Sequence, residues 1–140
     1  MDLVEEEEVL VEEAQVVAGK KTIIFDLDGT LIDSLEDIAV CMNQVLKELN
    51  LPIHKMEDYK YFVGGGISVL IDNALKGYSN EIKEEATKKF KVIYDQKLHS
   101  KTKPYDGIYE LLDELEKLDV NLAILSNKPH EFTLQYANSL

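Results

Sequence analysis

The sequence predicts an α/β fold in which two parallel strands are joined by a helical connection. Two short apolar runs, 22–26 and 120–125, have the length and composition of buried strands. Several amphipathic stretches with helical spacing lie between them. Because strands separated by helices favour a parallel pair with a crossover, we expect one sheet with a helical insertion in its connection.

The composition is that of a chain with a real core and an acidic surface. Hydrophobic residues make up 45% of the 140 residues, and 27 acidic against 15 basic residues give a formal net charge of −12. A nucleic-acid backbone requires clustered basic residues, and no stretch reaches the roughly 20 apolar residues of a membrane span. The acidic start lacks the basic region of a signal peptide. We therefore expect a cytoplasmic protein without a nucleic-acid or membrane partner.

Residues 1–20 form an acidic N-terminal extension. Leu3, Leu10, Ala14 and Val17 fall near helical spacing, and Gly19 is a plausible helix stop. The valine-rich stretches of the same segment also have β propensity. We expect a helix here.

The first helix is predicted by an apolar stripe and a start signal. Ser34 is a good N-cap, and Asp37 lies three residues later in the manner of a capping box. The stripe ends near Asn50. It includes Cys41, the single cysteine, which excludes an internal disulfide and is expected to be a small buried hydrophobe.

The rest of the chain carries four more stripes of helical spacing, each with a start or stop signal. In chain order they are a helix opened by the glycines 64–66 and stopped at Gly77, a long helix capped by Ser79 or Asn80, a helix over 108–118 after a turn at 104–107, and a helix that starts at Pro129 or His130. The histidines His54, His99 and His130 show no metal-ligand spacing and are expected at the surface or at helix ends.

Two aspartates directly follow the first strand. Residues 26–34 read Asp-Leu-Asp-Gly-Thr-Leu-Ile-Asp-Ser. Alternate strand residues point the same way, so Asp26 and Asp28 can face one point beyond the carboxyl end of a strand, where open α/β sheets place their ligands. Carboxylates there can act as nucleophile, metal ligand or proton shuttle. The alternative is a plain polar turn, because Asp and Gly are common turn residues.

The longer string Phe-Asp-Leu-Asp-Gly-Thr-Leu at 25–31 closely resembles the first motif of the haloacid dehalogenase-like phosphohydrolases. Within that superfamily the chain from about 21 to 140 looks most like the phosphoglycolate phosphatase group. The resemblance implies a Rossmann-like parallel core formed by 21–35 and 104–140. It also implies a helical cap of four helices over about 36–103.

The resemblance also implies a role for each motif residue. Asp26 would be the nucleophile that forms an aspartyl-phosphate, and Asp28 would protonate the leaving group and later deprotonate water. Both would help to hold Mg²⁺, which prefers oxygen ligands. Thr30 would settle the turn and belongs, with Ser126 and Asn127, to the expected phosphate-binding residues.

Two further segments carry weaker signals. Ser126 and Asn127 follow the second strand, where a hydroxyl and backbone N–H groups suit a phosphate oxygen; the alternative is an ordinary helix cap. The loop Gly64, Gly65 and Gly66 resembles the cap loop that selects the substrate, because glycine permits close backbone approach. The alternative is a flexible connector.

Two later motifs of the resembling family have no match in the sequence. One supplies a lysine that holds the phosphoryl group, and the other supplies an acidic pair that completes the Mg²⁺ site. Lys128 is close in sequence to the site and is the residue that could partly serve in place of this lysine. With only two strands expected, the sheet edges would be open, so we expect cover from residues 1–20, as a strand beside 22–26 or as a helix, or from oligomerisation or strand exchange.

These observations lead to one principal function and three alternatives. The principal one is a Mg²⁺-dependent phosphatase of a small phosphorylated metabolite, with phosphoglycolate first, acting through an aspartyl-phosphate. A sugar phosphomutase would share the first step. The others are a truncated or engineered non-catalytic fragment that assembles through its N-terminal segment, and a module that binds a divalent cation or phosphate without turnover.

Overall fold

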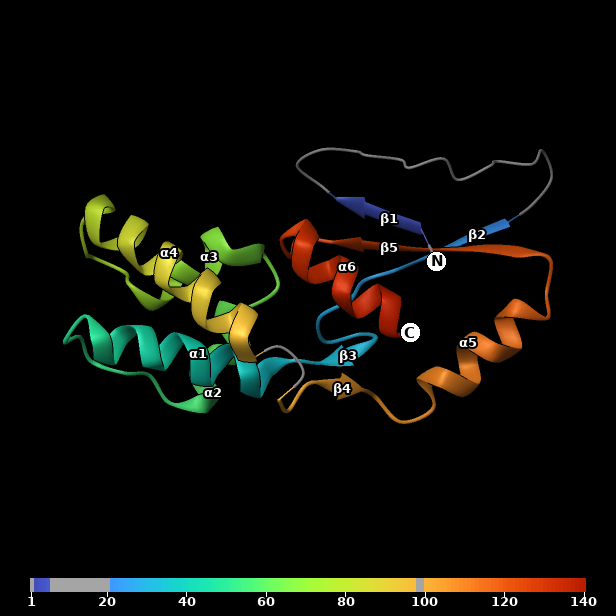
Figure 1. Ribbon diagram of the computed structural model, residues 1–140, viewed down its shortest axis with the longest axis horizontal. Coiled ribbons are helices and arrows are strands. Elements are labelled where there is room, and N and C mark those ends of the chain that lie inside the picture. The colour runs from blue at the N-terminus through green and yellow to red at the C-terminus, as the bar shows by residue number, and fades with distance from the viewer. Residues whose placement is uncertain (1, 6–20, 98–99) are drawn as a thin grey trace. The chain divides into compact units, whose positions relative to one another are not determined.

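The computed structural model describes residues 2–5, 21–97 and 100–140. The chain forms two compact units, one made of Met1–Asp33 with Pro104–Leu140 and the other of Ser34–Lys103. We call the first the sheet unit and the second the helical unit. Figure 1 shows the elements of each unit along the chain. Among the described residues, no helix is both long enough and apolar enough to cross a membrane.

Three parallel strands form the sheet of the sheet unit. The strands β1 (Asp2–Glu5), β5 (Val120–Ser126) and β2 (Lys21–Phe25) lie in the order β1-β5-β2. In the register of the central pair, Ile24 lies opposite Ala123 and Phe25 opposite Ile124. The predicted parallel pairing is therefore confirmed, and the carboxyl ends of β2 and β5 lie at the same edge of the sheet (Figure 1).

The expected helix in the N-terminal extension is wrong for residues 2–5, which form β1. The expectation that this extension covers the sheet as a strand is confirmed for residues 2–5, but the neighbour differs: β1 pairs with β5 and not with β2. The physical reason lies in the backbone of β5. A strand with one neighbour leaves the backbone N–H and C=O groups of its other edge without partners, and β1 supplies partners for that edge of β5. Residues 6–20 lie outside the described residues.

The core of the sheet unit forms around β5, the turn after β2 and two helices. Ile124 on β5 is fully buried, as are Leu27 and Leu31 in the turn. Helix α6 (His130–Ser139) buries Phe132 and Tyr136, whereas α5 (Ile108–Glu116) buries only Leu112. The turn and the start of α6 are thus both anchored by apolar side chains.

A two-stranded sheet lies where the chain passes from one unit to the other and back. It consists of β3 (Ile32–Asp33) and β4 (Lys103–Pro104). Just beyond β4, the backbone N–H of Tyr105 donates to the carbonyl oxygen of Leu31 at 3.2 Å. The chain therefore leaves the sheet unit and returns to it at neighbouring points.

Four helices make up the helical unit. They are α1 (Leu35–Glu48), α2 (Met56–Phe62), α3 (Gly66–Ala74) and α4 (Asn80–Lys97). The fully or nearly fully buried side chains come from all four helices and include Cys41, Met42, Val45, Leu46, Tyr59, Leu70, Ile71, Phe90 and Tyr94. As predicted for the long helix, the Ser79 hydroxyl accepts a hydrogen bond at its start, from the N–H of Ile82 at 3.3 Å.

Helix α2 was not predicted, because it shows no apolar stripe. Only Tyr59 of its seven residues is buried. This helix is instead fixed by polar contacts: the Tyr59 hydroxyl donates to Asn43, whose amide donates to the His54 carbonyl oxygen at 2.9 Å. The His54 ring nitrogen Nε2 lies 2.7 Å from the Ala74 carbonyl oxygen. His54 is therefore a structural residue of the helical unit.

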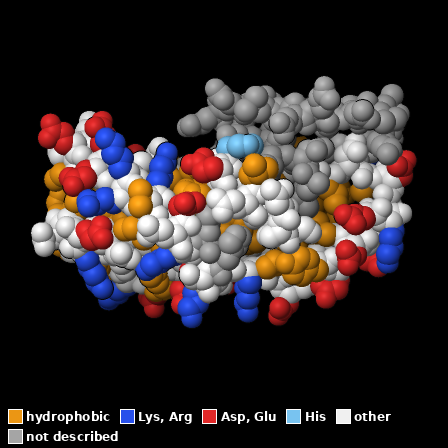
Figure 2. Space-filling view, viewed as in Figure 1, with side chains coloured by type: hydrophobic (Ala, Val, Ile, Leu, Met, Phe, Trp, Pro, Cys, Tyr) orange, Lys and Arg blue, Asp and Glu red, His pale blue; other side chains and the backbone are white. Residues whose placement is uncertain are grey.

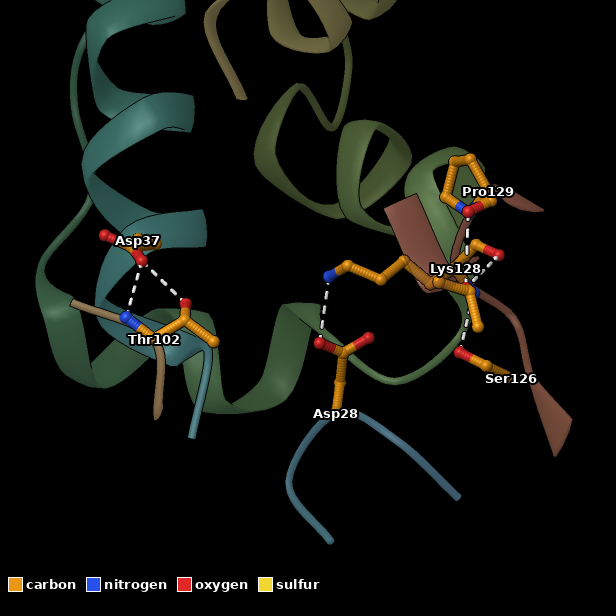
Figure 3. A network of polar contacts seen from close by, with 7 residues as sticks. Asp28, Asp37, Thr102, Ser126, Lys128 and Pro129 are labelled. Atoms are coloured by element: carbon orange, nitrogen blue, oxygen red, sulfur yellow. Dashed lines mark hydrogen bonds and ion pairs between the residues drawn. The ribbon is translucent and has the colours of Figure 1, made fainter. Parts of the chain in front are cut away.

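The predicted capping box of α1 is wrong. Ser34 is the N-cap residue, but its side chain makes no capping hydrogen bond. The buried Asp37 carboxylate instead accepts three hydrogen bonds from the returning chain: from the N–H of Lys101 at 3.0 Å, and from the N–H and hydroxyl of Thr102 at 2.7 and 2.6 Å (Figure 3). A buried carboxylate that accepts three hydrogen bonds is more costly to separate from its donors than an exposed side chain that caps a helix. The start of α1 is thereby fastened to the end of the helical unit.

Lysine and acidic side chains are interspersed on the face shown in Figure 2, with apolar side chains exposed between them. Ion pairs join neighbouring helices of the helical unit, including Lys83 with Asp72 at 3.3 Å and Lys89 with Glu48 at 3.7 Å. Exposed pairs of this kind contribute little to stability. The helical unit is therefore held mainly by its apolar core and its buried hydrogen bonds.

We expect Asp37→Ala to destabilise the protein by at least about 2 kcal/mol, because it leaves two N–H groups and a hydroxyl without their acceptor. Thermal or urea unfolding measures the change. The exposed Glu36→Ala is the matched control, since it removes the same charge from the same turn, and it should cost less than about 0.5 kcal/mol. Equal losses of stability in the two variants would contradict the proposed role of the Asp37 hydrogen bonds.

Cys41 is expected to react slowly with iodoacetamide in the folded protein. Burial raises the pKa of its thiol from 9.0 to about 11, which at pH 8 leaves about a hundredfold less thiolate. Mass spectrometry of timed samples, with and without urea, measures the difference. Equal labelling rates in the two conditions would show that the thiol is not buried.

Candidate functional site

The candidate site lies at the carboxyl edge of β2 and β5. Asp26 directly follows β2, and Ser126 is the last residue of β5. Because the two strands are parallel and adjacent, the segments that follow them emerge at one edge, although about one hundred residues separate them. Figure 3 shows Asp28 of the first segment together with Ser126 and Lys128 of the second.

The turn after β2 is built around a left-handed glycine and two buried leucines. Gly29 has a φ of +80°, and its N–H donates to the Ile32 carbonyl oxygen at 2.9 Å. The Leu27 carbonyl oxygen accepts from the N–H groups of residues 30, 31 and 32 at 3.0–3.2 Å. With Leu27 and Leu31 fully buried, the aspartates on either side of Leu27 are held at the edge of the sheet.

Asp26 is the exposed carboxylate of this turn. Its Oδ2 accepts from the Thr30 hydroxyl at 3.4 Å, which is a long hydrogen bond. Thr30, which is also exposed, thus lies beside Asp26, and its role in phosphate binding stays a prediction. An exposed carboxylate on a rigid turn is open to a reacting group from solvent.

Asp28 forms an ion pair with Lys128, whose Nζ lies 2.9 Å from Oδ1 (Figure 3). The two side chains are only 19% and 5% exposed. The ammonium also lies 5.4 Å from the centre of the Tyr136 ring, within the range of a cation–π contact. This pair joins the ends of β2 and β5 directly.

The backbone of Lys128 is held on both sides. Its N–H donates to the buried Ser126 hydroxyl oxygen at 3.1 Å, and its carbonyl oxygen accepts from the Thr133 hydroxyl at 3.1 Å. The alternative interpretation of residues 126–129 as a helix cap holds for Pro129, which is the N-cap residue of α6, but not for Ser126. Asn127, between Ser126 and Lys128, is exposed at the same edge.

The glycine loop belongs to the helical unit. Gly66 is the first residue of α3 and Gly65 its N-cap. A Cβ on Gly65 would lie 2.6 Å from Cγ2 of Val69, so glycine is required there by packing against its own helix. The substrate-selecting role of Gly64, Gly65 and Gly66 stays a prediction. Of the other predicted residues, His130 is exposed at the start of α6, and His99 lies outside the described residues.

Three residues around the segment after β5 were not predicted as site residues from the sequence. Lys128 was considered only in place of the missing lysine, and Thr133 and Tyr136 were not considered. Their signal is spacing: positions 133 and 136 lie one turn apart at the start of α6, on the face that buries Tyr136. Among the described residues, no group of three or more His, Cys, Asp or Glu side chains is placed to hold a metal ion.

Comparison with known proteins points to one family. Residues 23–139 match the family described as haloacid dehalogenase-like hydrolase. The chain is 40% identical over 126 residues to the phosphoglycolate phosphatase of Pseudomonas savastanoi pv. phaseolicola. The aligned region covers 84% of this chain and 46% of that protein. The chain spans about half the length of the curated relatives it matches.

Solved structures show the same similarity. A predicted phosphoglycolate phosphatase from Haemophilus somnus 129pt superimposes with a TM-score of 0.74 at 31% identity, covering 80% of this chain and 53% of that one. A haloacid dehalogenase-like hydrolase from Streptococcus pneumoniae gives 0.76 at 26% identity, over 86% and 55% of the two chains. The α/β core with its parallel sheet and helical insertion is thus a known fold.

We expect Gly29→Ala to destabilise the sheet unit by about 1 kcal/mol, because a Cβ is disfavoured at the left-handed φ of this turn. A Cβ there would meet no atom within 4 Å, so the cost is backbone strain alone. Gly29→Asn is the matched control and should lose less, since asparagine visits this region readily. Chemical denaturation measures the stability of both variants. An alanine variant as stable as the asparagine variant would contradict the left-handed conformation of residue 29.

Proposed function

Since the chain belongs to the haloacid dehalogenase-like hydrolases, we propose that it hydrolyses the phosphate monoester of a small metabolite, with phosphoglycolate as the first candidate. The observation that carries this proposal is the pair of aspartates at one strand end: Asp26 is exposed and Asp28 is held in place by Lys128. The phosphoglycolate phosphatases to which the chain is similar support the choice of substrate.

In the first step the Asp26 carboxylate attacks phosphorus and the bond from phosphorus to the leaving oxygen breaks. The carboxylic acid of Asp28 gives its proton to that oxygen, so an alcohol leaves. An aspartyl-phosphate then remains on Asp26. In the second step water attacks the same phosphorus and gives a proton to the Asp28 carboxylate. The bond between phosphorus and the Asp26 oxygen breaks, which releases inorganic phosphate and restores both groups.

The segment after β5 supplies the polar groups for the transferred phosphoryl group. Asn127 is exposed beside the buried Ser126, and α6 begins three residues after Asn127. Backbone N–H groups at the start of a helix favour an anion. In this proposal Asn127, the Ser126 hydroxyl and Thr30 face the phosphoryl oxygens while Asp26 attacks.

The donor atoms at the edge fit Mg²⁺, which is commonly held by one or two carboxylates together with substrate phosphate and water. The Asp26 carboxylate and the Asp28 backbone carbonyl oxygen would hold it, which leaves the Asp28 side chain for proton transfer. When bound, Mg²⁺ would neutralise charge on the phosphoryl oxygens.

We expect phosphate release from phosphoglycolate and p-nitrophenyl phosphate in the presence of Mg²⁺, and a loss of at least about a thousandfold in Asp26→Asn, because the amide cannot act as the nucleophile. A phosphate-detection assay measures both, and EDTA should suppress the wild-type rate. Asp113→Asn, which changes an exposed acid on α5 in the same way, is the control and should retain full activity. Failure of the wild-type chain to release phosphate from either compound would refute the proposal.

A further inference from the structure

Lys128 is an unusual lysine in this molecule. All 15 basic residues of the chain are lysines, and among the described ones Lys128 alone is buried. Removing an ammonium group from water is costly unless an opposite charge and hydrogen bonds replace the lost hydration. Inside the protein, Asp28 supplies the opposite charge for the Lys128 ammonium.

Its place in the sheet unit is equally distinctive. The other described lysines of this unit are Lys21, at the amino end of β2, and Lys117, which directly follows α5. Lys117 forms an ion pair with Glu114 at 2.6 Å in which both side chains are about two-thirds exposed. Of these three lysines, only Lys128 lies at the carboxyl edge beside Asp26 and Asp28.

The local backbone makes a lysine costly at this position. Lys128 directly precedes Pro129, the N-cap of α6, and the positive end of a helix dipole disfavours a cation nearby. The Ser126 and Thr133 hydroxyls nevertheless fix its backbone at 3.1 Å on each side. Its ammonium reaches across to the strand end one hundred residues earlier (Figure 3). The contact with Asp28 supplies the opposite charge that compensates for burial of the ammonium near the positive end of the helix dipole.

We propose that Lys128 is a positioning residue for Asp28: by binding Oδ1 it fixes the rotation of the carboxyl group, so that in the acid form the proton on Oδ2 is delivered to the leaving oxygen. The inference rests on the proposed function, in which Asp28 transfers that proton. A carboxylate on a short side chain can rotate about its last bond, so holding Oδ1 at 2.9 Å from Nζ defines where both oxygens lie. Lys128 itself exchanges no proton and forms no covalent bond in this scheme.

This role predicts a dependence on the leaving group. An alkoxide such as that of glycolate is a strong base and needs the Asp28 proton as the bond from phosphorus to oxygen breaks, whereas p-nitrophenolate is a weak base and leaves without one. Loss of the Asp28 position should therefore slow alkyl phosphates far more than p-nitrophenyl phosphate. A general loss of structure would slow both to the same extent.

The test compares Lys128→Met with the wild-type chain on phosphoglycolate and p-nitrophenyl phosphate. We expect kcat for phosphoglycolate to fall at least about tenfold more than kcat for p-nitrophenyl phosphate, with smaller changes in KM. The control Lys117→Met removes an ammonium from an exposed ion pair of the same unit and should leave both rates unchanged. Equal falls for the two substrates in Lys128→Met would overturn the inference.

The double variant Asp28→Asn/Lys128→Met gives a second test and removes both charges of the pair together. If Lys128 acts through Asp28, the double variant should hydrolyse phosphoglycolate as slowly as Asp28→Asn alone. If the two losses multiply, the inference fails.

The four proteins of this cycle also separate the inference from the proposed function. A wild-type chain that hydrolyses neither compound refutes the proposed function and the catalytic role of Lys128 with it. Thermal unfolding of the same four proteins then tests the ion pair alone: non-additive shifts in Tm are expected for paired groups, and additive shifts would show that Lys128 does not hold Asp28.

Discussion

The parallel pairing of β2 with β5 is the constraint on which the candidate site depends. Parallel strands end at the same edge of a sheet, so the segments after Phe25 and Ser126 must emerge together. The opposite direction for either strand would place Asp28 and Lys128 at different edges of the sheet. Pairing of β5 with β1 on its other side leaves β5 as the central strand, which steadies the segment that carries Lys128.

Two sets of polar contacts, each with a buried charged group, join segments that the apolar core alone does not fix relative to one another. In the sheet unit, the Asp28–Lys128 pair joins the two strand ends. In the helical unit, the Asp37 carboxylate joins the start of α1 to the returning chain. Removing one partner of a buried charge is costly, so each contact favours one arrangement of segments that are far apart in the sequence.

The sequence predicted most elements because they show strong local signals. The strands at 22–26 and 120–125 and the apolar stripes of α1, α3, α4, α5 and α6 are periodic patterns that depend on near neighbours. Helix α2 has one buried residue and so no stripe. The expected helix in the extension is wrong at residues 2–5 because their pairing with β5 is a long-range contact that local spacing does not reveal.

The difference between local signals and long-range contacts also separates the site residues that could be predicted from those that could not. Asp26 and Asp28 are adjacent to a strand end and could be identified from the motif alone. The predicted capping role of Asp37 was wrong, because its donors lie more than sixty residues away. The contact between Asp28 and Lys128 likewise spans one hundred residues, so position in the sequence suggested Lys128 but could not give its partner.

The closure of the helical unit by Asp37 has a consequence for how such proteins diversify. A unit whose first and last turns are bound to each other returns the chain to the point where it left, whatever lies between. Insertions, deletions or exchanged helices between α1 and Lys101 therefore need not alter the register of β2 and β5. The helical unit can therefore change in length and sequence while the strand ends keep their arrangement.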